Sequence, residues 1–319
     1  MEDHDQRFKT LLQSMFGDFL KLFFSAWAER FDLRHIEWLN LEIFPDPPRG
    51  RRRTLDMVAK LRTRQSVSGG AGGKQKRWLA LVHVEIESRD RVAPLRPRMW
   101  AAYHQLRAKY ELPVLPIGLY LRVGLDGVGI DAYEERFWEL ETVRFQYLYV
   151  GLPGLDALKY LEGDNWLGVA LSALMCVPKE RQVWLGAEAL RRITEAPLSE
   201  QQRYLLGECV ESYLPLDESQ WDEFNRLLSG ASYMETNKMR ASSRELGLAE
   251  GLEKGLEKGR EEGREEGRRE LLRALLEERF GPLSKRLARR VESLPTVEVR
   301  DVFTRALHAR SLRDLGLTD

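Results

Sequence analysis

The stretch LVHVEIES, residues 81–88, reads as a buried β-strand that carries two glutamates. Side chains alternate between the two faces of a strand. Its apolar side chains share one face: Val82, Val84 and Ile86. His83, Glu85 and Glu87 share the other face, and burying two carboxylates so close together is costly unless a cation lies between them. Three arrangements remain open: a solvated polar face, pairing with Arg or Lys, or a bound divalent metal.

The composition is that of a folded protein with no overall charge. The chain has 319 residues, of which 43% are hydrophobic, and its formal net charge is zero. That length suits one large domain or two smaller ones, and the balanced charge by itself indicates neither a nucleic-acid nor a membrane partner. No apolar run approaches the roughly 18–20 residues of a membrane span, and the first residues lack a signal-peptide pattern. With only Cys176 and Cys209, a disulfide framework is not expected, and we predict a cytoplasmic location.

The first half of the chain alternates between helical and extended patterns. Apolar residues recur at helical spacing from Phe8 to Phe23. Further elements are then predicted in this order: strands at 36–44, 54–61 and 78–88, a helix at 97–110, and strands at 112–121 and 142–153. A helix, three successive strands, a helix and two more strands predict a small α/β core with a mixed sheet.

The second half of the chain is predicted to be helical. Segments near 154–162, 165–175, 179–195, 199–213 and 217–229 have helical patterning, and prolines separate several of them. Two amphipathic stretches separated by Gly281-Pro282 follow near the end. We therefore divide the chain into four parts: an α/β core at 1–153, a helical extension at 154–240, a linker at 241–269 and a small helical domain at 270–319.

The linker contains a glycine at every fourth residue from Gly247 to Gly267. Each glycine costs a helix about 1 kcal/mol relative to alanine, and each Glu–Arg pair spaced i,i+3 returns only about 0.2–0.5 kcal/mol. Two interpretations remain open: a solvated, marginally helical linker, or a close-packed helix through which 246–270 forms a homo-oligomer. The GxxxG spacing does not indicate a pair of transmembrane helices here, because the intervening residues are charged.

Carboxylates are the remaining candidates for chemistry, since HExxH, GxSxG and Cys/His clusters are absent. Asp56 lies inside the predicted strand 54–61, and it approaches Glu85 and Glu87 if that strand pairs with 78–88. Three carboxylates on neighbouring strands make an oxygen-rich site suited to Mg²⁺ or Mn²⁺, which can activate a bound water. The alternative is that Asp56 merely ends its strand and the glutamates pair with nearby arginines.

These residues carry a family resemblance. The matching pieces are HDQRFKTLL at 4–12, LDMVAKL at 55–61, LVHVEIES at 81–88, RPRMWAAYHQLRAKY at 96–110 and LPVLPIGLYL at 112–121. In order and spacing, residues 4–150 resemble the recombination-promoting nuclease and putative transposase family (Rpn) of the PD-(D/E)XK nuclease superfamily. The glycine repeat and a small helical end are also typical of relatives. The resemblance implies a restriction-endonuclease-like core and a Mg²⁺-dependent DNA endonuclease linked to recombination or transposon-like activity.

Carried onto this sequence, the resemblance makes Asp56 and Glu85 the metal ligands. Glu87 departs from the pattern, because it occupies the position of the motif's lysine. A glutamate cannot supply a positive charge, but it can ligate a second metal or act as a general base. Lys60 is a candidate substitute for the missing cation, because it shares a strand face with Asp56. Leu55 stands where the motif has proline, a change that removes no chemistry.

DNA contact requires positive charge, because phosphates dominate affinity. The stretch 49–64 supplies it, and Arg51, Arg52, Arg53 and the helical Arg98 are the candidate phosphate contacts. No element that reads base edges is visible, so we predict little sequence specificity. The alternative function is a catalytically degenerate nuclease fold that acts as a DNA-binding or protein-interaction module.

Overall fold

The structure is a computed structural model with a mixed α/β architecture. It describes residues 2–39, 42–43, 53–54, 56–68, 76–87, 95–294, 296–309 and 311–316. The chain forms two compact units, residues 1–243 and 244–319. Within the described ranges, no helix combines the length and the apolar character needed to cross a membrane.

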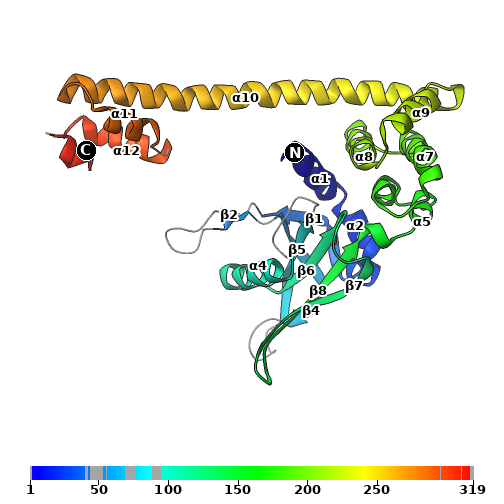
Figure 1. Ribbon diagram of the computed structural model, residues 1–319. Helices are drawn as coiled ribbons and strands as arrows, with labels where there is room; N and C mark the ends of the chain where they lie inside the picture. Colours follow the sequence, from blue (N-terminus) through cyan, green and yellow to red (C-terminus); the bar gives the residue numbers. More distant parts are fainter. Residues whose placement is uncertain are drawn as a thin grey trace. The chain divides into compact units, whose positions relative to one another are not determined.

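The first unit is built on a six-stranded mixed sheet with the strand order β1-β4-β5-β6-β8-β7 (Figure 1). The strands are β1 (Phe31–Trp38), β4 (Met57–Ser68), β5 (Lys76–Glu87), β6 (Val114–Tyr120), β7 (Gly127–Phe137) and β8 (Leu140–Gly151). β1, β4 and β5 are antiparallel neighbours, β6 runs parallel to β5 and β8, and β7 pairs antiparallel with β8. Strand β5 is therefore central, which is why its residues from Leu81 to Glu87 are buried on both faces.

Two further short strands, β2 (Glu42–Ile43) and β3 (Arg53–Thr54), pair in a separate antiparallel sheet. Short 3-10 turns join other elements of the chain: η1 (Leu152–Gly154), η2 (Ser172–Leu174), η3 (Lys179–Arg181), η4 (Ala231–Tyr233) and η5 (Leu312–Leu315).

Helices cover the two faces of the main sheet unequally (Figure 1). One face carries Met57 and Val84 and packs against α1 (Glu2–Ser14), α2 (Phe16–Phe23), α3 (Ser25–Ala28) and the helices that follow the sheet. On the opposite face, Val58 and Leu81 pack against Leu106 of α4 (Leu95–Tyr110). The alternation along β5 places Glu85 and Glu87 on this second face, beneath α4.

The helices after the sheet lie within the predicted segments. They are α5 (Ala157–Leu161), α6 (Trp166–Leu171), α7 (Gln182–Glu195), α8 (Glu200–Tyr213) and α9 (Glu218–Leu228). Capping boxes begin two of them, with Ser199 at α8 and Asp217 at α9. Their buried residues belong to the same hydrophobic core as the sheet, so the helical extension packs with the α/β part.

The second unit has a core of its own. Helix α10 (Met234–Phe280) runs through the glycine repeat, and α11 (Lys285–Glu292) and α12 (Thr296–Ala306) follow it. The core residues are Leu272, Leu276, Leu287, Val291, Leu294, Val299, Val302, Ala306 and Leu315. Gly281 adopts a positive φ just after α10, which confirms the predicted break between two helices.

One predicted strand is displaced in the structure, and one strand of the structure was not predicted. The strand predicted at 36–44 is replaced by β1, which begins at Phe31 and ends at Trp38. β1 is an edge strand and is partly exposed to solvent, so it carries charged residues. These charges interrupt the alternation of apolar and polar residues by which a strand is recognised in a sequence. Strand β7 was not predicted at all, since its sequence GVGIDAYEERF contains glycines and charges that resemble a loop.

Candidate active site

The pairing of β4 with β5, which the sequence left as a condition, brings Asp56 to the glutamate strand. Met57 pairs with Val84, so Asp56, one residue earlier in the chain, lies beside the next residues of β5. The backbone N–H of Ile86 donates a hydrogen bond of 2.8 Å to Asp56 Oδ2. The Asp56 carboxylate is therefore fixed at the level of Glu85, on the neighbouring strand.

A single arginine from α4 bridges the two glutamates. Arg98 Nη2 donates to Glu85 Oε2 at 2.7 Å, and Arg98 Nη1 donates to Glu87 Oε2 at 2.8 Å. Both carboxylates are buried. The planar guanidinium suits two simultaneous bonds to carboxylate oxygens. Of the three arrangements left open by the sequence, pairing with arginine is present, and the solvated polar face is wrong.

The remaining polar residues of the site complete the charge pairing. His83 Nε2 lies 3.0 Å from Glu85 Oε1 and is fully buried. Lys9 of α1 places its Nζ 3.0 Å from Asp56 Oδ1. Lys60, the predicted substitute cation, instead donates to Glu37 Oε2 at 2.8 Å. We use the name carboxylate cluster for Asp56, Glu85 and Glu87 together with Lys9, His83 and Arg98.

A glycine on β6 lies beside the first residue of α4. Gly118 pairs with Glu85 across the parallel strands. A Cβ atom at Gly118 would lie 2.9 Å from Leu95 Cδ2, in the first residue of α4. Real Cβ contacts are not that short, so a larger residue at this position would force the end of the Leu95 side chain to shift. Arg98 lies one turn further along α4.

The protein holds Glu85 in its ionised form. Burial raises the pKa of the Glu85 carboxyl, but the hydrogen bonds and charges of His83 and Arg98 outweigh it and lower the pKa to about 2. A buried carboxylate is stable only with such partners. Glu85 is therefore negatively charged throughout the neutral pH range.

A second polar network lies on neighbouring strands. Arg96 donates two hydrogen bonds of 2.9 Å to Asp131, and the Tyr147 hydroxyl also donates to Asp131. The hydroxyls of Tyr120 and Tyr147 are 3.3 Å apart. Burial raises the pKa of Tyr147, and its bond to Asp131 adds to the effect, so this phenol remains a hydrogen-bond donor. Tyr120 pairs with Glu87 in the sheet, which places the network next to the carboxylate cluster.

The carboxylate cluster suits Mg²⁺ in its chemistry, although it is no all-protein cage. Among the residues that the structure describes, no three His, Cys, Asp or Glu side chains are arranged to hold a metal ion. Mg²⁺ does not need such a group, because it commonly binds one or two carboxylates and keeps several waters. Asp56, just before β4, and Glu85 on β5 offer buried, hard oxygen donors, and they are the residues that would hold this ion.

The four arginines predicted to contact DNA do not form one surface among the residues that the structure describes. Arg51 and Arg52 lie outside the described residues, and of Arg53 only the backbone, in β3, is described. Arg98 faces the two glutamates. A basic hollow of about 700 Å³ is instead present near β1, and its charged lining residues are Arg34, His35, Glu37, Lys60 and Arg62.

The basic hollow shares a face of the sheet with the carboxylate cluster. Lys60 pairs with Leu81 and Arg62 pairs with Leu79, and paired residues point to the same face. Leu79 and Leu81 in turn lie on the Glu85 face of β5, because side chains two residues apart on a strand share a face. Lys60 is therefore roughly 13 Å along the sheet from Glu85, at about 3.3 Å per residue.

Two residues of the carboxylate cluster were assigned no site role from sequence. Lys9 follows the buried Phe8 in an amphipathic helix, where a solvated lysine gives the same pattern. The contact between His83 and Glu85 could have been predicted more easily than that of Lys9. Residues two apart on a strand place their side chains on the same face.

Comparison with protein-family models, with curated proteins and with solved structures finds no match to the chain. The geometry of the carboxylate cluster and the resemblance of residues 4–150 to the Rpn nucleases are therefore the grounds for a functional proposal.

Proposed function

We propose that the chain is a DNA endonuclease that hydrolyses phosphodiester bonds at the carboxylate cluster, with Mg²⁺ or Mn²⁺ as its cofactor. One observation carries the proposal: Asp56, the residue just before β4, is buried at the level of Glu85 on the adjacent antiparallel strand β5. This is the arrangement of the PD-(D/E)XK core that the sequence resembles. A restriction-endonuclease-like fold and a link to recombination rest on the same resemblance.

The residues of the cluster have distinct roles in this proposal. When bound, the metal ion lowers the pKa of a water molecule and offsets negative charge on the phosphate. The Ile86 N–H and Lys9 orient Asp56, while Arg98 and His83 orient Glu85 and keep it ionised. Each carboxylate is thereby held in one geometry before substrate arrives, which reduces the cost of organising the site.

Glu87 and Arg98 together replace the lysine of the motif. Glu87 has the carboxylate that can accept a proton from the attacking water. Arg98 places a permanent positive charge between Glu85 and Glu87, at 2.7 and 2.8 Å from their oxygens. A guanidinium in a buried site stabilises developing negative charge more strongly than the same group in water. Arg98 is therefore a better substitute for the lost cation than Lys60, which pairs with Glu37.

The basic hollow supports DNA as the substrate. Arg34, Lys60 and Arg62 offer charges to phosphate groups on the same face as the cluster. Contacts of this kind position a nucleic acid but carry no sequence information. We therefore expect cleavage with little sequence preference and with strong dependence on salt.

A second candidate function is favoured by the same double ion pair. Arg98 satisfies both glutamates and Lys9 satisfies Asp56, so the buried charges are paired by the protein itself. Such a site is stable without any metal. A catalytically degenerate nuclease fold, acting as a DNA-binding or protein-interaction module, would show this arrangement.

Plasmid nicking separates the two candidates. Purified protein is incubated with supercoiled plasmid and Mg²⁺ or Mn²⁺, beside Asp56→Asn, Glu85→Gln and the control Glu223→Gln, an exposed acid on α9. We expect nicking by the wild type and the control, and none by the two cluster variants. Thermal melts establish that each variant is folded.

Two results would count against the nuclease. DNA binding without nicking by the wild type would select the degenerate fold. Nicking that survives in both cluster variants would place the active site elsewhere. Calorimetric titration with Mg²⁺ gives an independent readout, because heat that disappears in Glu85→Gln requires this carboxylate as a ligand.

A further inference from the structure

The hairpin formed by β7 and β8 ends in an exposed apolar tip. Phe137, Trp138 and Leu140 are 62%, 83% and 64% exposed. Phe137 pairs with Leu140, so Trp138 and Glu139 form the two-residue turn between the strands. The rings of Phe137 and Trp138 pack on each other, with centroids 4.8 Å apart. Large apolar side chains gathered at one exposed point mark an interaction surface. We call residues 137–140 the hairpin tip.

The backbone of the turn is unusual for the residue it contains. Trp138 has a φ of +54°. A positive φ in a two-residue hairpin loop is normally adopted by glycine or asparagine, and a bulky side chain there is an outlier. Residues held in such conformations gather at functional sites. Trp138 thus occupies a position where the turn alone would favour glycine.

The charges around the hairpin tip exclude two kinds of partner. The charged residues nearby are Glu134, Glu135, Arg136, Glu139, Glu141 and Arg144. The excess of acid repels the phosphates of nucleic acids and the surface of anionic membranes. A fitting partner has an apolar hollow with cations at its rim.

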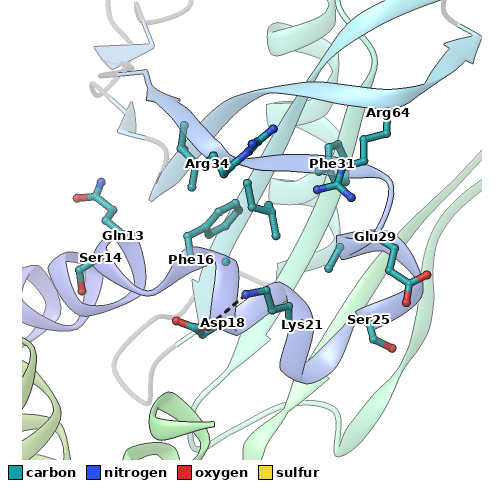
Figure 2. A pocket seen from close by; sticks show the side chains of 14 residues that line it. Gln13, Ser14, Phe16, Asp18, Lys21, Ser25, Glu29, Phe31, Arg34 and Arg64 are labelled. Carbon is teal, nitrogen blue, oxygen red and sulfur yellow. Dashed lines mark ion pairs between the residues drawn. The ribbon is translucent and has the colours of Figure 1, made fainter. Parts of the chain in front are cut away.

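The same chain contains such a hollow between α2, α3 and β1 (Figure 2). Its volume is about 560 Å³, and Phe16, Phe31 and Ile36 are among the apolar residues that line it. A volume in the range of about 300–1,000 Å³ is typical of sites that take a compact apolar group. Its charged lining residues are Asp18, Lys21, Glu29, Arg34 and Arg64. We call this site the α2–β1 hollow.

The lining of the α2–β1 hollow has three cations against two acids, whereas acids outnumber cations around the hairpin tip. Among the described residues, no ion pair involves Glu29 in the hollow or Glu135 beside the tip. Lys21 lies 3.7 Å from Asp18, and Arg34 lies 3.0 Å from Asp32. Arg64, at the rim of the α2–β1 hollow, and Glu139, at the hairpin tip, have no such partner among the residues described. The two surfaces are thus complementary in apolar character and in charge.

The hairpin tip cannot occupy the hollow of its own chain. β7 and β1 are the opposite edges of the sheet, five inter-strand spacings or roughly 24 Å apart. We propose that the hairpin tip of one copy inserts into the α2–β1 hollow of a second copy, with Glu139 facing Arg64. Because the two surfaces differ, copies add head to tail, and the assembly grows until a ring closes or continues as a chain.

Sedimentation velocity on the full chain tests this proposal. The variants are Trp138→Ala, Glu139→Arg, Arg64→Glu and the double charge swap, with Glu180→Arg as the control at an exposed acid on η3. The wild type and the control should associate with rising concentration. Trp138→Ala should raise the dissociation constant about 30-fold or more, as for a hot-spot aromatic. Each single charge reversal should weaken association, and the double swap should restore it.

Three results would overturn the proposal. One is a wild type that remains monomeric at the highest concentration tested. Another is an association constant that is equal in the wild type and Trp138→Ala. The third is a double swap no stronger than its single variants, because Arg64 would then not face Glu139. The nicking assay is independent of these outcomes, since none of the substituted residues belongs to the carboxylate cluster.

Discussion

The two glutamates of β5 and three glutamates of α10, Glu235, Glu265 and Glu277, are paired with cations, but the energetics of the two groups differ. Glu85 and Glu87 are buried and share Arg98, which comes from a different element. Glu235 in α10 lies 2.7 Å from Lys238, one turn away on the same helix, and both side chains are mostly exposed. The distances are similar, so distance alone does not rank these ion pairs.

Burial explains the difference. An exposed pair competes with water and contributes about 0–1 kcal/mol. A buried charge has lost its water, so removing its partner costs about 3–5 kcal/mol. We therefore expect the buried pairs of β5 to contribute far more to stability than the exposed Glu235–Lys238 pair of α10. Four predictions test this contrast, from the largest expected effect to the smallest.

Arg98→Met should lower the free energy of unfolding by about 3–5 kcal/mol, because two buried carboxylates lose their shared cation. The matched control is Arg191→Met on α7. Arg191 also pairs with two glutamates, but its side chain is 34% exposed, against 14% for Arg98. We expect about 1 kcal/mol or less for the control. Equal losses in urea denaturation would mean that burial does not distinguish the two arginines.

Acid should destabilise the protein through Glu85. Its pKa in the folded chain is about 2, below the ordinary 4.5. The carboxylate therefore contributes its full stability above about pH 5 and loses it as the pH falls toward 2, by about 3 kcal/mol in total. Urea denaturation between pH 7 and pH 2 should show a smaller acid loss in Glu85→Gln than in the wild type. Parallel pH profiles would contradict the prediction.

Alanine at a repeat glycine should stabilise α10. A Cβ atom at Gly259 or Gly263 meets nothing within 4 Å, so Gly259→Ala and Gly263→Ala should each add about 1 kcal/mol to the local helix. Slower amide hydrogen exchange in α10 would show this. The alternative of a homo-oligomer through 246–270 predicts the reverse, because a close-packed glycine stripe has no room for methyl groups. Sedimentation of the same variants decides between the two.

Glu235→Gln should change stability by only about 0.2–0.5 kcal/mol, since it breaks one exposed i,i+3 pair. High salt should remove even this difference, because exposed pairs are screened. Thermal melts at low and high salt measure it. If Glu235→Gln lowered the free energy of unfolding as much as Arg98→Met, exposed and buried ion pairs would contribute equally, contrary to our expectation.

The helices and the central strands could be predicted from sequence because their signal is local. Periodicity identified the strand at 78–88, the helix at 97–110 and the helical extension, and the structure has β5, α4 and α5–α9 in those places. Edge strands are harder, because solvent on one or both faces removes the apolar period. For this reason β7 was missed and β1 was displaced.

The contacts of the carboxylate cluster could likewise be predicted only in part from the sequence. Alternation along β5 was enough to group His83, Glu85 and Glu87, and pairing with β4 brought Asp56 to them. The sequence could not show that Arg98 rather than a metal or Lys60 would lie between the glutamates. That contact joins α4 to β5, two elements whose approach is set by packing.

By itself, then, the sequence determined the mixed α/β class, the helical second half and the shared strand face of His83, Glu85 and Glu87. These follow from backbone periodicity, which acts over a few residues. Only the tertiary structure decided that Lys9 faces Asp56, that Arg98 bridges two glutamates and that the apolar hairpin tip is left exposed. Such contacts join residues far apart in the chain, and their distances are set by packing rather than by pattern.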